Sequence, residues 1–210
     1  MNIIKPKNIN TEKLENGNLS LVNEDEIVSY CKFENEKFDN INLYEIEFEN
    51  CRFNNVYMQN GALEKITFSD VIFDRCNFSN TEFLENTFIR CEFDNCKVFG
   101  CNFSGSRLHN VSFINSNASY TSFSMASIES TQFKDVMLNN AYFQESKIKN
   151  LHFDNADLTQ SRFFKTKLKD VDLSTCKIEG IAITAEDIKG AVIDQFQAVD
   201  LLYLIGVKLK

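Results

Sequence analysis

Apolar residues recur at every fifth position along most of the chain. Stepping by five from Phe33 to Ile183, all 31 positions are apolar, and they hold 17 of the 20 phenylalanines. A helical face repeats about every 3.6 residues and a strand about every 2, so neither element explains this pattern. A period of five predicts instead a chain that turns a corner every five residues.

Two further columns follow the same period. Two positions before each apolar residue lies a column of mostly small residues, which contains all seven cysteines and has Glu36 and Asn86 as polar exceptions. Two positions after each apolar residue Asn is frequent, and its side chain bonds nearby backbone and tolerates unusual φ and ψ angles. We therefore predict that one large and one small residue in every five point inward, and that the Asn column occupies corners.

Individual five-residue segments resemble the pentapeptide repeat, whose consensus is A-[DN]-L-x-x. Examples are Cys-Asn-Phe-Ser-Asn at 76–80, Cys-Asn-Phe-Ser-Gly at 101–105 and Ala-Asp-Leu-Thr-Gln at 156–160. The resemblance covers residues 28–193 and implies an all-β fold, a right-handed quadrilateral β-helix with four pentads in each coil. The 155 residues of the 31 pentads would form nearly eight coils. At the inter-strand spacing of about 4.8 Å, the rod would be roughly 37 Å long.

Both ends of the chain leave the repeat and are expected to cap it, because terminal coils expose apolar edges and open backbone. Residues 1–27 are predicted to form an N-terminal cap. Residues 194–210 are predicted to form a C-terminal helix and tail, in which Asp194 and Gln197 fit a capping box. The helix is expected over 195–205, and its apolar face either plugs the β-helix or also meets a second subunit.

The C-terminal segment resembles that of the quinolone-resistance (Qnr) branch of the pentapeptide-repeat proteins, approximately D-I-[RK]-G-x-x-[IL]-D-x-[YF]-Q-A-x-x-L-x-x-x-[IL]-G-[IV]. The matching residues are Asp187, Ile188, Gly190, Ile193, Asp194, Phe196, Gln197, Ala198, Leu201, Ile205 and Gly206. The resemblance implies a homodimer joined at its C-termini that binds DNA gyrase and topoisomerase IV. It also implies that an acidic rod imitates DNA and protects these enzymes from quinolones. The uninterrupted repeat over 33–183 is similar to the loop-less chromosomal members from Gram-positive bacteria.

The net charge of −8 lies entirely in the first 100 residues, which hold 18 acidic and 10 basic side chains, whereas the rest hold 12 of each. Stacking residues 20 apart gathers an acidic face around the Phe33 column, the predicted contact with a topoisomerase. The contact residues predicted on this face are Glu34, Asp74, Glu92, Asp94, Asp154 and Asp172. The predicted dimer contacts are Phe196, Leu201, Leu202 and Ile205. The alternative is an acidic surface that only keeps the rod soluble.

The composition argues against several functions. An acidic chain of pI about 4.9 lacks the clustered cations that a direct nucleic-acid binder needs. No apolar stretch is long enough for a membrane helix or a signal peptide, so we expect a cytoplasmic protein whose cysteines are reduced core residues. Neither His109 nor His152 belongs to a catalytic or metal-binding motif, and a filled β-helix has no cleft. We therefore expect no enzymatic activity, no metal and no cofactor.

Two other classes of function remain open from the sequence. The chain could be a generic repeat scaffold that binds another protein, or a self-immunity protein against a gyrase-directed toxin. A pull-down dominated by a partner other than a topoisomerase would favour the scaffold. A toxin gene cluster beside the gene would favour the immunity protein.

Overall fold

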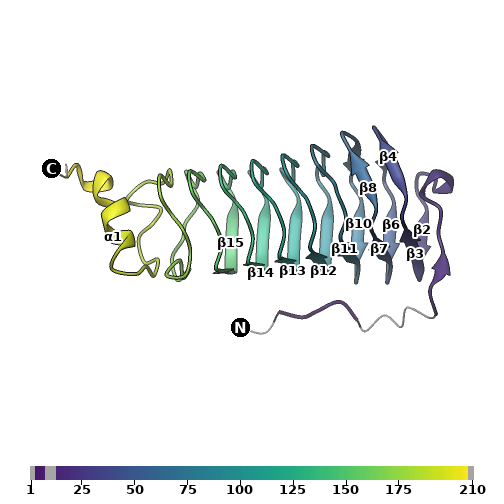
Figure 1. Ribbon diagram of the computed structural model, residues 1–210, viewed down its shortest axis with the longest axis horizontal. Coiled ribbons are helices and arrows are strands. Elements are labelled where there is room, and N and C mark those ends of the chain that lie inside the picture. The colour runs from purple at the N-terminus through teal and green to yellow at the C-terminus, as the bar shows by residue number, and fades with distance from the viewer. Residues whose placement is uncertain (1–2, 8–12, 208–210) are drawn as a thin grey trace.

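The computed structural model describes residues 3–7 and 13–207. The chain forms a long rod of stacked turns with a small helix at its C-terminal end (Figure 1). It is nearly all β, as the repeat predicted. Among the residues described, no helix has the length and apolar character needed to cross a membrane.

Strands of successive turns pair in parallel, with each residue beside the one 20 positions further along. Phe33 lies beside Phe53, and Phe53 lies beside Phe73. Among the strands of the described residues, β1 alone departs from this register, since it places Glu15 beside Cys31. The strands are β1 (Glu15–Asn16), β2 (Ile27–Ser29), β3 (Cys31–Glu34), β4 (Lys37–Asp39), β5 (Asn42–Tyr44), β6 (Glu47–Glu49), β7 (Arg52–Asn54), β8 (Tyr57–Gln59), β9 (Ala62–Glu64), β10 (Thr67–Ser69), β11 (Ile72–Asp74), β12 (Thr87–Asp94), β13 (Arg107–Ile114), β14 (Ser127–Lys134) and β15 (Lys147–Asp154).

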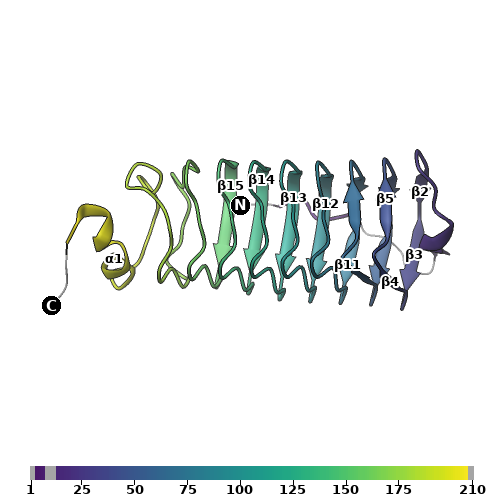
Figure 2. The same ribbon diagram turned by 90° about the horizontal axis from the view of Figure 1, so that it is seen from above.

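The five-residue spacing places successive segments on four sides of the rod, named here face 1 to face 4. Face 1 contains residues 27–29, face 2 residues 32–34, face 3 residues 37–39 and face 4 residues 42–44, each with its successors at intervals of 20. Strands β12 to β15 each run across faces 1 and 2 and belong to one 11-stranded sheet. Faces 3 and 4 carry short strand pairs followed by isolated bridges. Figure 2 shows the same turns from above.

The repeat forms about seven turns that carry strands. On face 1 these turns are marked in order by β2, β6, β10, β12, β13, β14 and β15. Beyond β15 the described chain pairs through isolated bridges, such as Asp157 with Lys177 and Asp172 with Val192. The last pentads therefore continue the repeat as turns without strands, and the β-helix expected from the sequence is confirmed.

The corners between the faces lie in the left-handed backbone region at every fifth residue from Asp25 to Asp170. Asn is the commonest residue at these corners, and its short polar side chain enters this region at lower cost than most others. The corner N–H is also paired, as when Asn35 donates to the carbonyl of Asn54 in the next turn at 3.0 Å. The predicted corner column of Asn residues is therefore confirmed.

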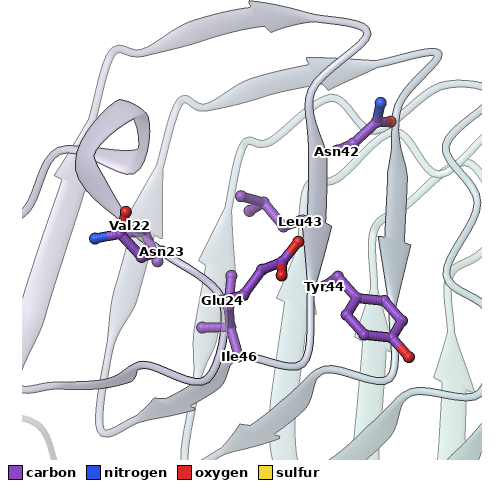
Figure 3. A pocket seen from close by; sticks show the side chains of 7 residues that line it. All are labelled: Val22, Asn23, Glu24, Asn42, Leu43, Tyr44 and Ile46. Carbon is purple, nitrogen blue, oxygen red and sulfur yellow. The ribbon is translucent and has the colours of Figure 1, made fainter.

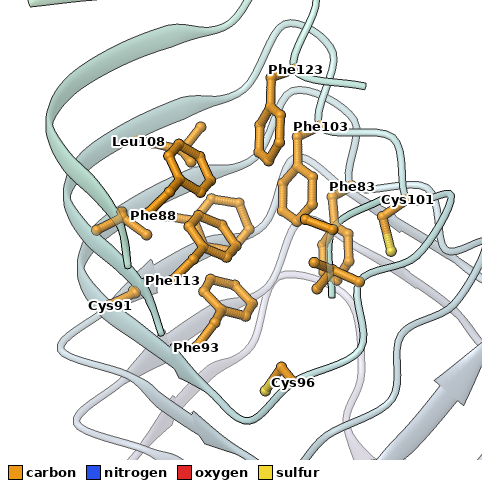
Figure 4. Packing of buried hydrophobic residues seen from close by; sticks show 14 of the residues in the cluster. Phe83, Phe88, Cys91, Phe93, Cys96, Cys101, Phe103, Leu108, Phe113 and Phe123 are labelled. Atoms are coloured by element: carbon orange, nitrogen blue, oxygen red, sulfur yellow. The ribbon is translucent and has the colours of Figure 1, made fainter. Parts of the chain in front are cut away.

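The inward columns fill the rod with aromatic rings (Figure 4). On face 2, phenylalanines from Phe33 to Phe153 stack with ring centroids 4.5–5.5 Å apart. On the opposite face 4, a second stack runs from Phe83 to Phe163 at 4.7–5.2 Å. The two stacks meet edge to face, and such aromatic pairs are favourable. Because the rings occupy the interior, the outer surface is where a partner can bind.

The two polar exceptions in the small column both have backbone partners. The fully buried Asn86 side chain accepts the N–H of Ile66 at 2.7 Å and donates to the carbonyl of Leu63 at 2.8 Å. Glu36 accepts the N–H of Leu19 at 3.3 Å, and burial raises the pKa of its carboxyl. These bonds offset the cost of placing polar side chains inside.

The first turn is covered by the segment from residue 13 to β2. The 3₁₀ helix η2 (Leu19–Leu21) places Leu19 on the core, where it is 1% exposed. Residues 3–7, in contrast, lie along the side of the rod (Figure 1). Residues 1–2 and 8–12 of the predicted cap, and 208–210 of the predicted tail, lie outside the described residues.

The prediction of one continuous helix over 195–205 is wrong. The structure has a short α-helix, α1 (Gln197–Asp200), and a 3₁₀ helix, η3 (Leu202–Ile205), which meet at Leu201. Leu201 and Leu204 both pack against the core. Their three-residue spacing suits the tighter 3₁₀ turn, which places residues i and i+3 one above the other.

The capping box predicted at the start of this segment is confirmed. The Asp194 N–H donates to Gln197 Oε1, and the Gln197 N–H donates to Asp194 Oδ1, both at 2.9 Å. The Gln197 amide also donates to the carbonyls of Leu173 and Cys176 at 2.7 Å. The buried glutamine thus joins the helix to the last turns of the repeat.

Candidate partner-binding surface

The acidic face predicted from the sequence is face 2, and the register brings only part of it together. Glu92 and Asp94 share strand β12, and Asp74 on β11 lies directly beside Asp94. The other three predicted residues lie elsewhere along the rod and do not join this group: Glu34, Asp154 and Asp172.

Cations on face 2 offset several of these charges. Arg52 and Arg75 both contact Asp74 Oδ2, at 3.1 and 3.2 Å. Lys32 lies 3.4 Å from Glu34, and Lys134 lies 3.8 Å from Asp154. Face 2 is therefore mixed in charge, which makes it a weak imitation of a nucleic acid.

A denser group of carboxylates lies where faces 4 and 1 meet, near the N-terminal end. We call it the acidic edge, and its members all keep at least part of their surface exposed: Glu24, Asp25, Glu26, Glu45, Glu47, Glu49, Glu64, Glu82 and Glu85. The register stacks them, since Glu64 lies beside Tyr44, and the Glu45 N–H donates to the Glu64 carbonyl at 3.1 Å. Lys65 is the one cation among them and pairs with Glu45 at 3.3 Å. Within the described part of the chain, the other eight carboxylates form no ion pair.

The acidic edge approaches the linear charge density of DNA. Its nine carboxylates occupy the first four turns, roughly 19 Å, so one falls about every 2 Å. Double-stranded DNA carries one negative charge per about 1.7 Å. Sequence reasoning missed this surface because it looked for stacked acidic residues only around the Phe33 column. The signal was present in the excess of acids within the first 100 residues.

A shallow hollow opens on face 4 beside the acidic edge (Figure 3). The Glu24 side chain lies in it among Leu43, Tyr44 and Ile46. The hollow combines a small apolar floor with carboxylate and phenol groups at its rim. That combination suits contact with a cationic side chain of a protein partner better than a small apolar ligand.

The four predicted dimer contacts occupy two different environments at the C-terminal end. Phe196 and Ile205 are 76% and 71% exposed. Leu201 packs against the core, and Leu202 is half-buried. Four other apolar side chains near this end are also exposed: Val192, Val199, Tyr203 and Val207.

The cysteines sit in the small inward column, as expected. Six of the seven are buried, and Cys31 is partly exposed. Burial raises the pKa of both Cys51 and Cys91 to about 12, so these thiols stay protonated. Cys91 donates to the carbonyl of Phe68 at 3.3 Å. The described residues contain no cluster of three or more potential metal-ligating side chains.

The four-sided rod, its 20-residue register and its large and small inward columns define a pentapeptide-repeat β-helix. Residues 66–143 and 86–163 match the family model for the pentapeptide repeat region. The two matches together span residues 66–163, which lie within the observed repeat. The comparison with curated proteins gave no match.

Several solved structures are similar to this chain. A structure of QnrB1, a plasmid-mediated fluoroquinolone resistance protein, has 17% identity and a TM-score of 0.39 and covers 88% of this chain and 99% of its own. HetL, a protein involved in heterocyst differentiation regulation from the cyanobacterium Nostoc sp. strain PCC 7120, has 13% identity and a TM-score of 0.41, with coverage of 82% and 91%. A pentapeptide repeat protein from the Arabidopsis thaliana thylakoid lumen has 15% identity and a TM-score of 0.39, with coverage of 61% and 72%.

Proposed function

We propose that this chain is a Qnr-like DNA mimic that binds DNA gyrase and topoisomerase IV in the cytoplasm and protects them from quinolones. The acidic edge carries this proposal, because its nine carboxylates lie at a spacing close to that of DNA charges, and eight of them form no ion pair within the described residues. The repeat fixes these charges on a rod, so they stay in place when a basic surface approaches. A topoisomerase would bind the edge in place of DNA, and no chemical step is needed.

The C-terminal segment gives a second, independent reason for this proposal. It resembles the Qnr branch at eleven positions, among them Asp194 and Gln197 of the capping box. The uninterrupted repeat suggests the loop-less chromosomal type. We include in the proposal a homodimer formed through the exposed apolar side chains at this end, Phe196 and Ile205 foremost.

The direct test is a supercoiling assay with purified gyrase or topoisomerase IV from a Gram-positive source and ciprofloxacin. We expect the protein to restore activity at a near-stoichiometric concentration. Inhibition without rescue would support binding by charge mimicry and contradict protection. If the protein changes neither activity nor quinolone sensitivity of either enzyme, the proposed function is wrong.

Two matched variants locate the contact surface. Glu47→Lys with Glu49→Lys reverses two charges on strand β6 of the acidic edge, and Glu92→Lys with Asp94→Lys does the same on strand β12 of face 2. The quantity compared is the protein concentration that restores half of the supercoiling activity in the presence of ciprofloxacin. We expect this concentration to rise about 10-fold for the first variant and by less than about 3-fold for the second. The opposite order would place the contact on face 2, as the sequence predicted.

A generic scaffold is the second candidate, and one observation favours it. On face 3, Phe99 and Tyr120 pack together at 5.4 Å outside the rod, and Met137 is exposed close by along the same face. An exposed apolar group of this kind suits a protein partner with an apolar surface better than an enzyme with a basic, DNA-binding surface. A pull-down that depends on Phe99 and Tyr120 and contains no topoisomerase would support this candidate.

A further inference from the structure

Residues 3–7 near the N-terminus lie along the side of the rod. Figure 1 shows residues 3–7 running beside the turns, parallel to the long axis. Hydrogen bonds fix this segment to corners 63 and 106 residues away in the sequence. The segment, which we call the arm, thus occupies a defined place on the corner row between faces 1 and 2.

Two buried polar side chains of this corner row bind the arm backbone. The Lys7 N–H donates to Asp70 Oδ1 at 3.1 Å, and the Ile4 N–H donates to Asn110 Oδ1 at 3.1 Å. Asp70 is 1% exposed and Asn110 is 5% exposed. Lys7 Nζ also lies 3.3 Å from Asp70 Oδ2. One corner therefore receives both a backbone N–H and a lysine cation.

Arg90 makes Asp70 a preformed acceptor. Its Nε and terminal nitrogen lie 2.7 and 2.6 Å from the two carboxylate oxygens. This two-point contact orients the carboxylate. Burial by itself would raise the pKa of Asp70, but the hydrogen bonds from Arg90 and from Lys7 hold that pKa below its ordinary value. The acceptor is thus charged and fixed at neutral pH.

The spacing of the two acceptors matches an extended peptide. Asp70 and Asn110 lie two turns apart, about 10 Å along the rod. Ile4 and Lys7 are three residues apart, about 9–10 Å in an extended or polyproline conformation. Of the two residues between them, Pro6 has no N–H and so needs no acceptor. The arm and the corner row therefore fit in both length and chemistry.

We propose that the row Asp70, Arg90 and Asn110 is a binding site for an extended peptide segment that carries a lysine. The arm is its resident occupant, and a protein partner with a segment of the same chemistry binds there when the arm is displaced. Recognition rests on two backbone N–H groups three residues apart and one cation at the second of them. This proposal does not depend on the acidic edge or on a topoisomerase.

The test uses the full chain and a labelled peptide, Ile-Ile-Lys-Pro-Lys, acetylated at its N-terminus. Lys7→Glu places a carboxylate against Asp70 and should displace the arm while leaving the site intact. Fluorescence anisotropy should show at least about 10-fold tighter peptide binding to this variant than to the wild type. Lys5→Glu is the matched control, since Lys5 forms no ion pair in the described residues, and it should bind the peptide like the wild type.

Two second-site variants show whether the peptide uses the proposed row. Adding Asp70→Asn to Lys7→Glu removes the charge, and adding Asn110→Gly removes the amide acceptor while keeping the left-handed corner. Each should lower the gained affinity by at least about 10-fold. Failure of Lys7→Glu to bind the peptide, or binding that survives both second-site changes, would overturn the proposal.

Discussion

Replacing Gly61 by alanine tests how tightly the turns of the rod are stacked. Gly61 lies in the small inward column, where alanine is the consensus residue of the repeat, so the sequence pattern predicts a harmless or stabilising change. The structure predicts the opposite. A Cβ atom on Gly61 would lie 2.2 Å from the Ile41 carbonyl oxygen and 3.2 Å from two other backbone atoms of Ile41.

The cost follows from this contact. A carbon and a carbonyl oxygen approach no closer than about 3.3 Å, so the two turns must separate locally by about 1 Å. Overpacking of this kind costs about 1–3 kcal/mol. The Ile41 oxygen also accepts the Ala62 N–H at 3.0 Å, and weakening that bond adds up to about 1 kcal/mol. Replacing glycine by alanine also lowers the conformational entropy of the unfolded chain, and this offsets the loss of stability by about 0.4–1 kcal/mol. Taking the middle of each range, the net loss is about 2 kcal/mol, which lowers Tm by about 4–8 °C in a chain of this length.

Thermal and urea unfolding followed by far-UV circular dichroism measure this loss. Ala141→Gly is the control, because Ala141 occupies the same column with its Cβ fully buried. Removing that Cβ should also destabilise the protein, by about 0.5–1 kcal/mol or more. A Gly61→Ala variant with an unchanged or higher Tm would refute the reasoning about Ile41.

Three further predictions concern the C-terminus, the cysteines and the arm. Phe196→Ser should lower the mass measured by light scattering from dimer to monomer, whereas Leu21→Ser, equally exposed at the other end, should not; a dimer that survives Phe196→Ser would exclude this contact. Cys91, whose pKa is raised to about 12 by burial, should resist iodoacetamide at pH 8 while the partly exposed Cys31 reacts; equal rates by mass spectrometry would contradict the buried assignment. Because the pKa of Asp70 is lower in the folded state, its stabilising effect on the arm is present above its ordinary value of about 4 and is lost as pH falls through the lowered value. The protection factor of the Ile4 and Lys7 amides, which is the intrinsic exchange rate divided by the observed one, should therefore fall only in strongly acidic solution, and a fall near neutral pH would contradict this assignment.

The sequence predicted the interior far better than the surface. The Phe column determined which side chains point inward, because only one residue class in five is uniformly large and apolar. The Asn column likewise located the corners, since few other residues enter the left-handed region easily. The C-terminal capping box was predictable because Asp194 and Gln197 hydrogen-bond to each other within four residues of sequence.

Features that depend on distant contacts were not predictable in this way. The helix divides at Leu201 because Leu201 and Leu204 pack on the end of the rod, which local propensity does not record. The arm is held by corners far away in sequence, so nothing near Lys7 indicates its position. The acidic edge combines residues of two faces, whereas the sequence argument looked for acidic contacts on one. In each case the prediction required knowledge of contacts between residues far apart in the sequence.

The five-residue period separates the interior of the rod from its surface in a way that bears on how such chains diverge. An insertion or deletion of one pentad keeps the large and small columns in phase, because every fifth residue still points inward. It nevertheless rotates all later outward residues by one face. A single such event between Glu49 and Glu64 would divide the acidic edge between two sides of the rod while leaving each inward column in phase. Surface patterns can therefore be rearranged in quarter turns under a nearly constant core, and two repeat proteins with the same cross-section can present unrelated faces to their partners.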